Sequence, residues 1–220
     1  MIRAIPLHDR DKFYQNRDVN ALVDLSLDNL NNKLFLDIIH LIQSRNLKFV
    51  HKTIEKYKSR VDGFQKEIYN NIGCCFDRIY GDELNKDNLR GAFLELIVHK
   101  FLNKKYGSNP EYNGAIHCNL EISGNTNYKT VDVFAFSSDI GFVSENKIGV
   151  FYFENHDIEN LKKIYVDSKH CLKPYIITLA TKSYIDTKLT ELYLDDSTNV
   201  WVNGEGINII SADNIVSFFS

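Results

Sequence analysis

Apolar residues recur at intervals of three and four along the first half of the chain, which is the spacing of a helix with one buried face. This pattern predicts a helical stretch over 18–43, with an interruption expected around 29–32. It predicts further helices over 47–61, 64–79 and 89–107. The first half of the chain is therefore expected to be helical.

After Pro110 the period shortens to that of strands. Three short runs, at 115–123, 130–137 and 141–149, are separated by turn-forming segments and predict three strands. A helical pattern over 156–170 follows them. The next run, 174–181, is continuously apolar, as in a strand buried on both faces. The tail is expected to add strands at 199–204 and 207–211 and a short helix at 212–219.

This order of elements predicts an α/β fold with a mixed central sheet flanked by helices. A helix between the third strand and the fourth allows those two strands to pair in parallel, whereas the first three can pair as antiparallel hairpins. We expect a helical amino-terminal region over residues 1–82 and an α/β domain over residues 83–220.

Three charged residues interrupt the apolar pattern of the second and third expected strands. Asp132 lies inside one strand, and Glu145 and Lys147 lie at the end of the next. An ionised side chain in a half-buried strand is costly unless it is paired, hydrogen-bonded or bound to a metal. Glu145 and Lys147 project to one face because they are two residues apart, and a hairpin would bring Asp132 to the same side.

Two carboxylates beside an ammonium suit a hard divalent cation that keeps several waters. The backbone carbonyl of Asn146 is a candidate further ligand. Lys147 cannot bind the metal, but it can orient or help deprotonate a water and stabilise charge on a phosphate. Glu95, on the helix before the strands, shares a stripe with Gly91 and apolar residues and is expected to face inward to a polar site.

An acid on a helix in "RGAFLE" (Glu95), an aspartate on a strand in "VDVFAF" (Asp132) and a strand ending in "SENK" (Glu145 to Lys147) occur in that order, before a basic helix and a strand. This arrangement resembles the PD-(D/E)XK nuclease superfamily, which includes type II restriction endonucleases and archaeal Holliday-junction resolvases. The resemblance covers residues 89–181.

The resemblance implies a restriction endonuclease-like αβββαβ core and Mg²⁺-dependent hydrolysis of phosphodiester bonds, with Mn²⁺ able to substitute. Asp132 and Glu145 would be metal ligands, Lys147 the catalytic lysine and Glu95 an auxiliary acid or ligand. It also implies an endonuclease on DNA, in restriction, defence or DNA processing, and activity as a homodimer.

The composition sets limits on the partners. The chain has 220 residues, of which 44% are apolar and 25% charged, with a formal net charge of −3, so it is not expected to coat nucleic acid through its overall charge. No signal-peptide pattern and no membrane-spanning run are visible, which predicts a cytoplasmic protein without a membrane partner. The cysteines have no C-x-x-C spacing, so neither a zinc site nor a disulfide framework is indicated.

Two groups of lysines are candidates for substrate contact. Lys48, Lys52 and Lys56 recur every fourth residue and could follow a phosphate backbone, but the same stripe is also typical of the solvated side of an amphipathic helix. Lys162 and Lys163, on the helix after the charged motif, are nearer to the expected site.

Each of these features also has a structural interpretation. Taken alone, Glu145 and Lys147 could be an ordinary ion pair at a strand end. Asp139 fits turn chemistry, His99 a partly buried structural histidine, and His156 a helix cap. The alternative hypothesis is therefore a non-catalytic protein, a nucleic-acid-binding or assembly subunit on a nuclease-like scaffold.

Overall fold

A computed structural model describes residues 1–150, 153–192 and 206–219. The chain divides into two compact units. One, the sheet unit, combines Met1–Arg10 with Val98–Ser220, and the other, the helical unit, is Asp11–Ile97.

The sheet unit contains every strand of the described residues. Its elements, in chain order, are β1 (Ile2–Pro6), the part of α6 (Lys86–Tyr106) from Val98 onward, β2 (Asn113–Ile122), β3 (Val131–Phe136), β4 (Gly141–Lys147), α7 (Asn155–Asp167), β5 (Lys173–Thr178), α8 (Lys182–Leu192), β6 (Asn208–Ile210) and α10 (Ile215–Phe218).

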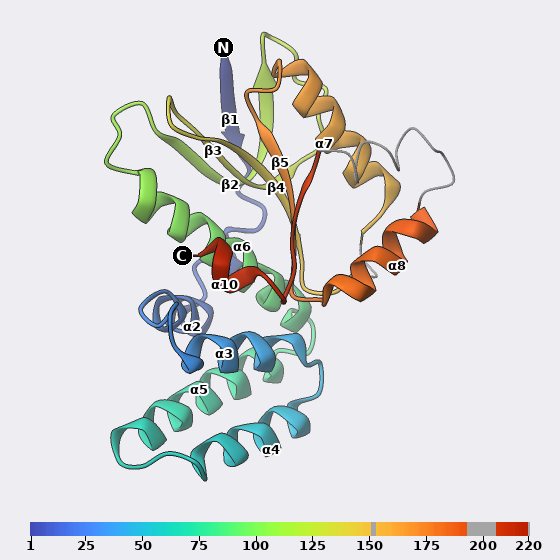
Figure 1. The fold of residues 1–220 in the computed structure, drawn as a ribbon. Helices are drawn as coiled ribbons and strands as arrows, with labels where there is room; N and C mark the ends of the chain where they lie inside the picture. The colour runs from blue at the N-terminus through green and yellow to red at the C-terminus, as the bar shows by residue number, and fades with distance from the viewer. Residues whose placement is uncertain (151–152, 193–205, 220) are drawn as a thin grey trace. The chain divides into compact units, whose positions relative to one another are not determined.

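The strands lie in the sheet in the order in which they occur in the chain, β1-β2-β3-β4-β5-β6 (Figure 1). The first four pair antiparallel, and β4, β5 and β6 pair in parallel. Helix α7 connects β4 to β5 and makes their parallel pairing possible.

One face of the sheet is covered by α7 and α8. Val143 of β4 and Ile176 of β5 belong to a buried core with Ile158 and Leu161 of α7 and Ile185 of α8. Glu145 is two residues after Val143, so the pleat directs it to this same face, next to the start of α7. The sheet therefore places an acid at the edge of an apolar core.

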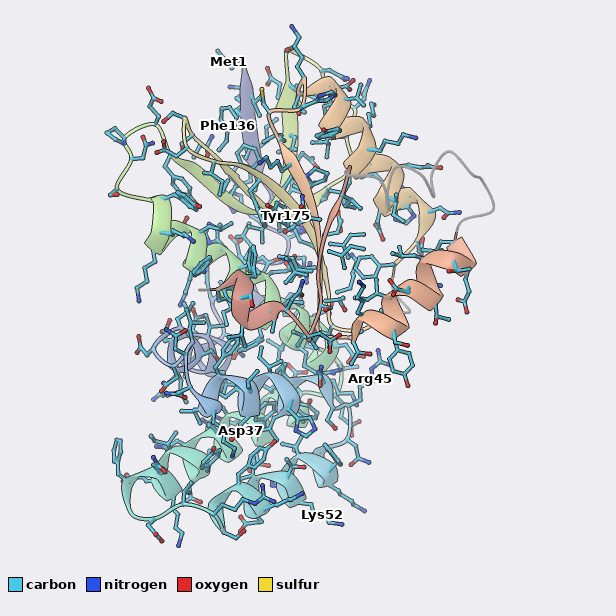
Figure 2. All side chains as sticks on the ribbon, in the orientation of Figure 1. Met1, Asp37, Arg45, Lys52, Phe136 and Tyr175 are labelled. Carbon is cyan, nitrogen blue, oxygen red and sulfur yellow. The ribbon has the colours of Figure 1, made fainter. Side chains whose placement is uncertain are left out.

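An aromatic cluster covers the opposite face. Phe142 of β4 stacks on Tyr175 of β5 with ring centroids 4.5 Å apart, and Phe218 of α10 contacts both rings (Figure 2 labels Tyr175). Phe101 of α6 packs against Phe218 and Phe219. Helices therefore lie on both faces of this sheet.

In the helical unit, asparagine side chains cap the first turns of three helices that follow short connections. The Asn16, Asn32 and Asn46 side chains accept hydrogen bonds from backbone N–H groups at the first turns of α2, α3 and α4 respectively. The elements are α1 (Asp11–Tyr14), α2 (Arg17–Leu27), α3 (Lys33–Gln43), α4 (Leu47–Lys58), α5 (Phe64–Gly81) and α6 up to Ile97.

The mixed α/β fold predicted from the sequence is confirmed, and so is the interruption of the first helical stretch, which is the gap between α2 and α3. Strand β1 and helix α8 were not predicted. The expected division at residue 82 differs from the observed units, because Ile2–Pro6 pairs with β2 and α6 spans both units. The strand expected at 199–204 lies outside the described residues.

Among the described residues, none of the helices combines the length and the apolar character needed to cross a bilayer.

Candidate functional site

Three residues predicted from the sequence meet at the carboxyl end of β4. The Lys147 ammonium lies 3.2 Å from Oε2 of Glu145 and 3.9 Å from Oδ2 of Asp132. Asp132 and Glu145 are both buried, with Glu145 only 4% exposed, and the Lys147 side chain is partly accessible. One cation thus contacts two carboxylates from neighbouring strands.

The register of the hairpin explains why Asp132 reaches this position. The last antiparallel pair is Val133 with Ser144, and one step further the same register would place Asp132 opposite Glu145. There the Asp132 carboxylate accepts a hydrogen bond of 2.7 Å from the backbone N–H of Asn146. This bond fixes one oxygen of Asp132 against the backbone of β4.

Lys147 is held in its charged form. Burial disfavours the ammonium, but the carboxylates of Asp132, Glu145 and Asp157 outweigh that effect and raise the pKa of Lys147 above its ordinary value. A lysine with a raised pKa is protonated at neutral pH. It can donate hydrogen bonds and stabilise negative charge there, but it is a poor general base.

Glu145 is in the opposite situation. Burial raises its pKa well above the ordinary carboxyl value, and the negative charges of Asp132 and Asp157 raise it further, while the Lys147 ammonium works against both. The Glu145 carboxylate is therefore disfavoured by its burial and by its acidic neighbours, and Lys147 offsets only part of this. A further cation beside Glu145 would favour its ionised form.

Asp157 is a member of the site that the sequence analysis did not identify as one. It is buried near the start of α7, where its Oδ2 accepts a hydrogen bond of 3.0 Å from the backbone N–H of Glu154, and it acts electrostatically on both Glu145 and Lys147. His156 lies between, with Nδ1 2.8 Å from Glu154 and Nε2 3.2 Å from Asp157. The sequence places Asp157 at the third position of the helix that follows "SENK", close to the charged motif, but an acid at that position is also typical of helix capping.

Arg10 is the second member that was missed. Its Nη1 lies 4.0 Å from Oδ1 of Asp132, so Asp132 has a cation on each oxygen. Arg10 follows β1, and the pairing of β1 with β2 brings it close to β3. No motif in the sequence marks it.

Glu95 belongs to the helical unit. Its side chain is 2% exposed, and it accepts a short hydrogen bond from the hydroxyl of Tyr14, on α1 of the same unit. An acid at this depth needs such a donor, because burial without one is costly.

The predicted substrate-binding lysines have different environments. Lys162 is half-buried on α7, and Lys163 donates a hydrogen bond of 2.6 Å to the carbonyl of Asn127 while its ammonium lies 4.9 Å from the ring centroid of Tyr128. The three lysines on α4 are all exposed, in the helical unit: Lys48, Lys52 and Lys56.

The residues that were given structural interpretations have local partners. Asp139 accepts a hydrogen bond of 2.8 Å from the Asn109 side chain, and its N–H donates to Ser137, as expected for a turn. His99 lies 3.3 Å from Asn103, one helical turn away, and burial lowers its pKa, as does Lys100 next to it. Neither residue contributes to the site around Lys147.

The donor set fits Mg²⁺ in one of its common protein environments, one or two carboxylates with the remaining positions filled by water and phosphate oxygens. Asp132 and Glu145 both contact the Lys147 ammonium, and burial, followed by the negative charge of Asp132, raises the pKa of Glu145. In the part of the chain that the structure describes, no group of three or more His, Cys, Asp or Glu side chains has the geometry of a complete metal cage. A Mg²⁺ ion held by these two carboxylates would keep water or substrate as its other ligands.

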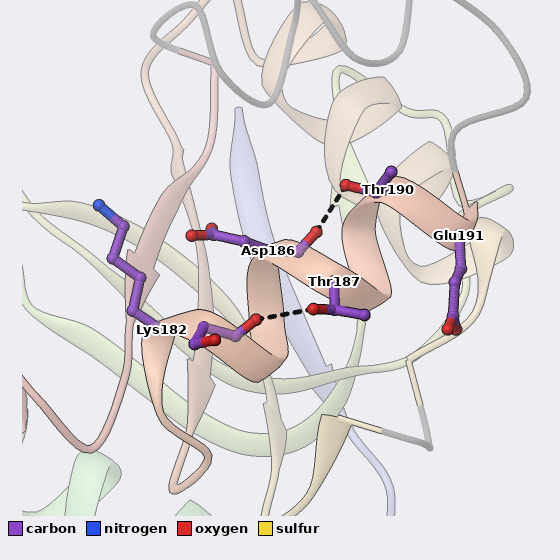
Figure 3. Close-up of a pocket in the computed structure, with 6 residues that line it drawn as sticks. Lys182, Asp186, Thr187, Thr190 and Glu191 are labelled. Carbon is purple, nitrogen blue, oxygen red and sulfur yellow. Dashed lines mark hydrogen bonds between the residues drawn. The ribbon is translucent and has the colours of Figure 1, made fainter.

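A separate hollow lies along one face of α8 (Figure 3). Its hydrogen bonds are local to the helix, from the Thr187 hydroxyl to the carbonyl of Ser183 at 3.0 Å and from Thr190 to that of Asp186 at 2.8 Å. No polar groups from a second element converge on it among the described residues that line it. It is not part of the candidate site.

Comparisons with known proteins leave the function open. No protein-family model matches the sequence, and no curated protein matches it significantly. Among solved structures, the chain is similar to protein VC1899 from Vibrio cholerae, with 12% identity and a TM-score of 0.48. The match covers 99% of this chain, but the chain spans only 58% of the length of VC1899. A likeness at this level supports no argument about activity.

Proposed function

We propose that this protein is a Mg²⁺-dependent nuclease that hydrolyses phosphodiester bonds in DNA, on an αβββαβ core of the restriction endonuclease-like kind. The observation that supports this function best is the contact of one ammonium, Lys147, with carboxylates of two adjacent strands, Asp132 and Glu145. The order α6, β2, β3, β4, α7, β5 agrees with the proposal.

In this proposal Asp132 and Glu145 bind the metal, and the backbone carbonyl of Asn146 is a further ligand. The hydrogen bond from Asn146 N–H orients Asp132, so that one carboxylate oxygen keeps a fixed direction. When bound, Mg²⁺ would polarise the scissile phosphate and make a coordinated water more acidic.

Lys147 and Arg10 would stabilise the charge that develops on the phosphate. Both are cations beside Asp132, and Lys147 stays protonated because the surrounding carboxylates raise its pKa. Protonated side chains in a partly buried site donate to developing negative charge more effectively than in water. Lys147 therefore acts as a cationic hydrogen-bond donor that positions the phosphate and the attacking water.

The test is a cleavage assay on supercoiled plasmid, linear duplex, branched DNA and RNA, with MgCl₂ or EDTA. The native protein is expected to cut DNA only with Mg²⁺ or Mn²⁺, and Lys147→Ala to lower the rate by at least a hundredfold, the order of one lost transition-state donor. Lys169→Ala, an exposed lysine of the same unit, is the matched control. Cleavage that persists in EDTA or in Lys147→Ala would contradict the mechanism.

A second candidate function is a non-catalytic nucleic-acid-binding or assembly subunit. One observation favours it: Asp132 already interacts with the Asn146 N–H, with Lys147 and with Arg10, so the cluster is largely neutralised by its own chain. Binding of DNA without cleavage under every metal condition would select this function. As part of the first proposal, the nuclease acts as a homodimer in the cytoplasm.

A further inference from the structure

The helical unit has a hollow of its own at the connection between α3 and α4. It has a volume of about 410 Å³, within the usual ligand-pocket range of ~300–1,000 Å³. Its lining residues come from the end of α3, the connection and the first turn of α4: His40, Gln43, Ser44, Asn46 and Phe49. We refer to it as the α3–α4 hollow.

Two aromatic rings form part of its wall. Phe49 is 44% exposed although it is large and apolar, and the His40 ring lies against it, with centroids 5.8 Å apart and planes at 79°. The hydroxyl of Tyr57 lies 2.7 Å from Nδ1 of His40 and fixes the direction of that ring. Phe49 thus presents a ring to solvent next to a second, oriented ring.

Buried donors hold the backbone of the connection in place. Arg90, itself buried, donates from Nε to the carbonyl of Ile42 at 2.9 Å and from Nη2 to that of Gln43 at 2.8 Å. The hydroxyl of Tyr80 donates to the carbonyl of Ser44. A pocket fixed in this way loses little conformational entropy when a ligand binds.

The formally charged residues of 45–52 are all cations, and Asp87, an acid next to this connection, is paired with Arg90 at 2.9 Å. Arg45, Lys48 and Lys52 are all exposed, and residues 45–52 contain no Asp or Glu (Figure 2 labels Arg45 and Lys52). The nearest acid along α4, Glu55, is paired with Lys58 at 2.7 Å, and Asp77 of α5 is paired with His51 at 2.9 Å. The ligand class that complements an exposed ring surrounded by cations is a flat base joined to phosphates.

We infer that the α3–α4 hollow binds an unpaired base of single-stranded DNA, with Phe49 as the stacking surface and Arg45, Lys48 and Lys52 on the adjacent phosphates. The base must be unpaired, because in a duplex both faces of each base are covered by its stacked neighbours. The choice of DNA rests on the proposed function. The stacking site itself rests on the helical unit alone.

The test measures the binding of fluorescein-labelled oligothymidylate to the full-length protein by anisotropy, in EDTA so that no cleavage occurs. Phe49→Ala is expected to weaken binding by roughly 5- to 150-fold, the range for the loss of one base–aromatic stack. Phe64→Ala is the matched control, because Phe64 is 75% exposed in the same unit but outside the hollow. It is expected to leave Kd unchanged, and Phe49→Trp to preserve binding.

Lys52→Ala tests the phosphate contact separately. It should reduce the slope of log Kd against log salt concentration by about 0.7, the value for one phosphate on a single strand. Lys66→Ala serves as its control, since Lys66 is an exposed lysine paired with Asp62 on the same unit.

Several results would overturn the inference. One is that the native protein does not bind oligothymidylate, and another is that Phe49→Ala binds it as tightly as the native protein does. The inference also fails if Phe49→Ala loses as much affinity for duplex DNA as for the single strand, or if the native protein binds oligouridylate more tightly than oligothymidylate. With an oligonucleotide that lacks bases, the native protein and Phe49→Ala must have the same Kd, because no base is left to stack.

The proposed nuclease function fails or survives independently. Lys147→Ala should lower the cleavage rate by at least a hundredfold, and in the Lys147→Ala background Phe49→Ala should still weaken oligothymidylate binding by the same factor as in the native protein. If no variant or metal condition gives cleavage while Phe49 still governs binding, the nuclease proposal fails and the base-binding site stands.

Discussion

The backbone N–H of Asn146 donates a 2.7 Å hydrogen bond to the carboxylate of Asp132, joining the ends of two strands through a side chain. The side-chain amide of Asn146 is buried, and among the described residues neither its nitrogen nor its oxygen has a hydrogen-bond partner. The backbone of one residue thus orients the acid on the face of Glu145 and Lys147, while its side chain projects from the opposite face. The orientation of Asp132 depends on this register, because a one-residue slip would invert every side chain of β4.

Asp132→Asn is expected to remove divalent-metal binding with little change in shape. The amide keeps an oxygen that can accept from Asn146 N–H but loses the charge that attracts the metal. We expect Mg²⁺ at about 100 times its Kd to stabilise the native protein by about 2.7 kcal/mol, and the variant not at all. Thermal melting with MgCl₂ or EDTA measures this, with Asp139→Asn as the control. An equal Mg²⁺ shift in Asp132→Asn would contradict the assignment.

Lys147→Met is expected to destabilise the sheet unit by about 3 kcal/mol at neutral pH. Removal of one partner of a buried ion pair leaves the other charge uncompensated, at a cost of about 3–5 kcal/mol, and the partial exposure of Lys147 places this case at the low end. Urea unfolding gives the value. Lys147→Met combined with Glu145→Gln should recover part of the loss; if the double variant is less stable than the single one, Glu145 is not the source.

Glu145→Gln is expected to make the protein more stable above neutral pH. Burial and the nearby carboxylates raise the pKa of Glu145 in the folded state, so the folded protein binds a proton that the unfolded chain has already released. Stability is therefore fully present below the ordinary carboxyl pKa and falls as pH rises through the raised one. Urea unfolding between pH 4.5 and 9 should show this decline in the native protein and a flatter profile in Glu145→Gln. The exposed Glu111→Gln should follow the native curve.

The sequence was sufficient to predict the three central residues of the site, but not Arg10 and Asp157 beside them. Asp132, Glu145 and Lys147 could be brought together on paper because strand period and hairpin pairing are local rules. Arg10 reaches Asp132 only through the pairing of β1 with β2, whose residues are distant in sequence. Asp157 could not be identified because its position in the first turn of α7 fits capping, and that role coexists with its electrostatic effect on Glu145.

The same division applies to the fold. The break before α3 was predictable, because asparagines disfavour helix interiors and Asn32 caps the next helix. Strand β1 was not, because five residues with an irregular burial pattern become a strand only by pairing with β2. Helix α8 was missed because only Ile185 and Leu189 on it are buried, which is too weak a period to detect.

Tyr14→Phe is expected to destabilise the helical unit by about 1.5–3 kcal/mol, because it removes a hydrogen bond to a buried carboxyl, Glu95. Urea unfolding measures the loss. Tyr184→Phe is the control, since Tyr184 is exposed, and it should unfold like the native protein. A Tyr14→Phe protein of native stability would show that the hydroxyl contributes nothing to the burial of Glu95.

The four cysteines are expected to react with a thiol reagent in two classes. Burial, reinforced by Asp18, raises the pKa of Cys75 to about 11, and burial together with Asp132 raises that of Cys118 to about 12. Both are protonated at pH 8, and because the thiolate is the nucleophile they should react slowly in the folded protein. Cys74 and Cys171 are exposed and should react fast. A chromogenic disulfide reagent should therefore titrate about half of the thiols quickly in buffer and all of them in urea. Replacement of both Cys74 and Cys171 by serine should remove the fast phase; a fast phase that survives would mean that Cys75 or Cys118 is accessible, contrary to their burial.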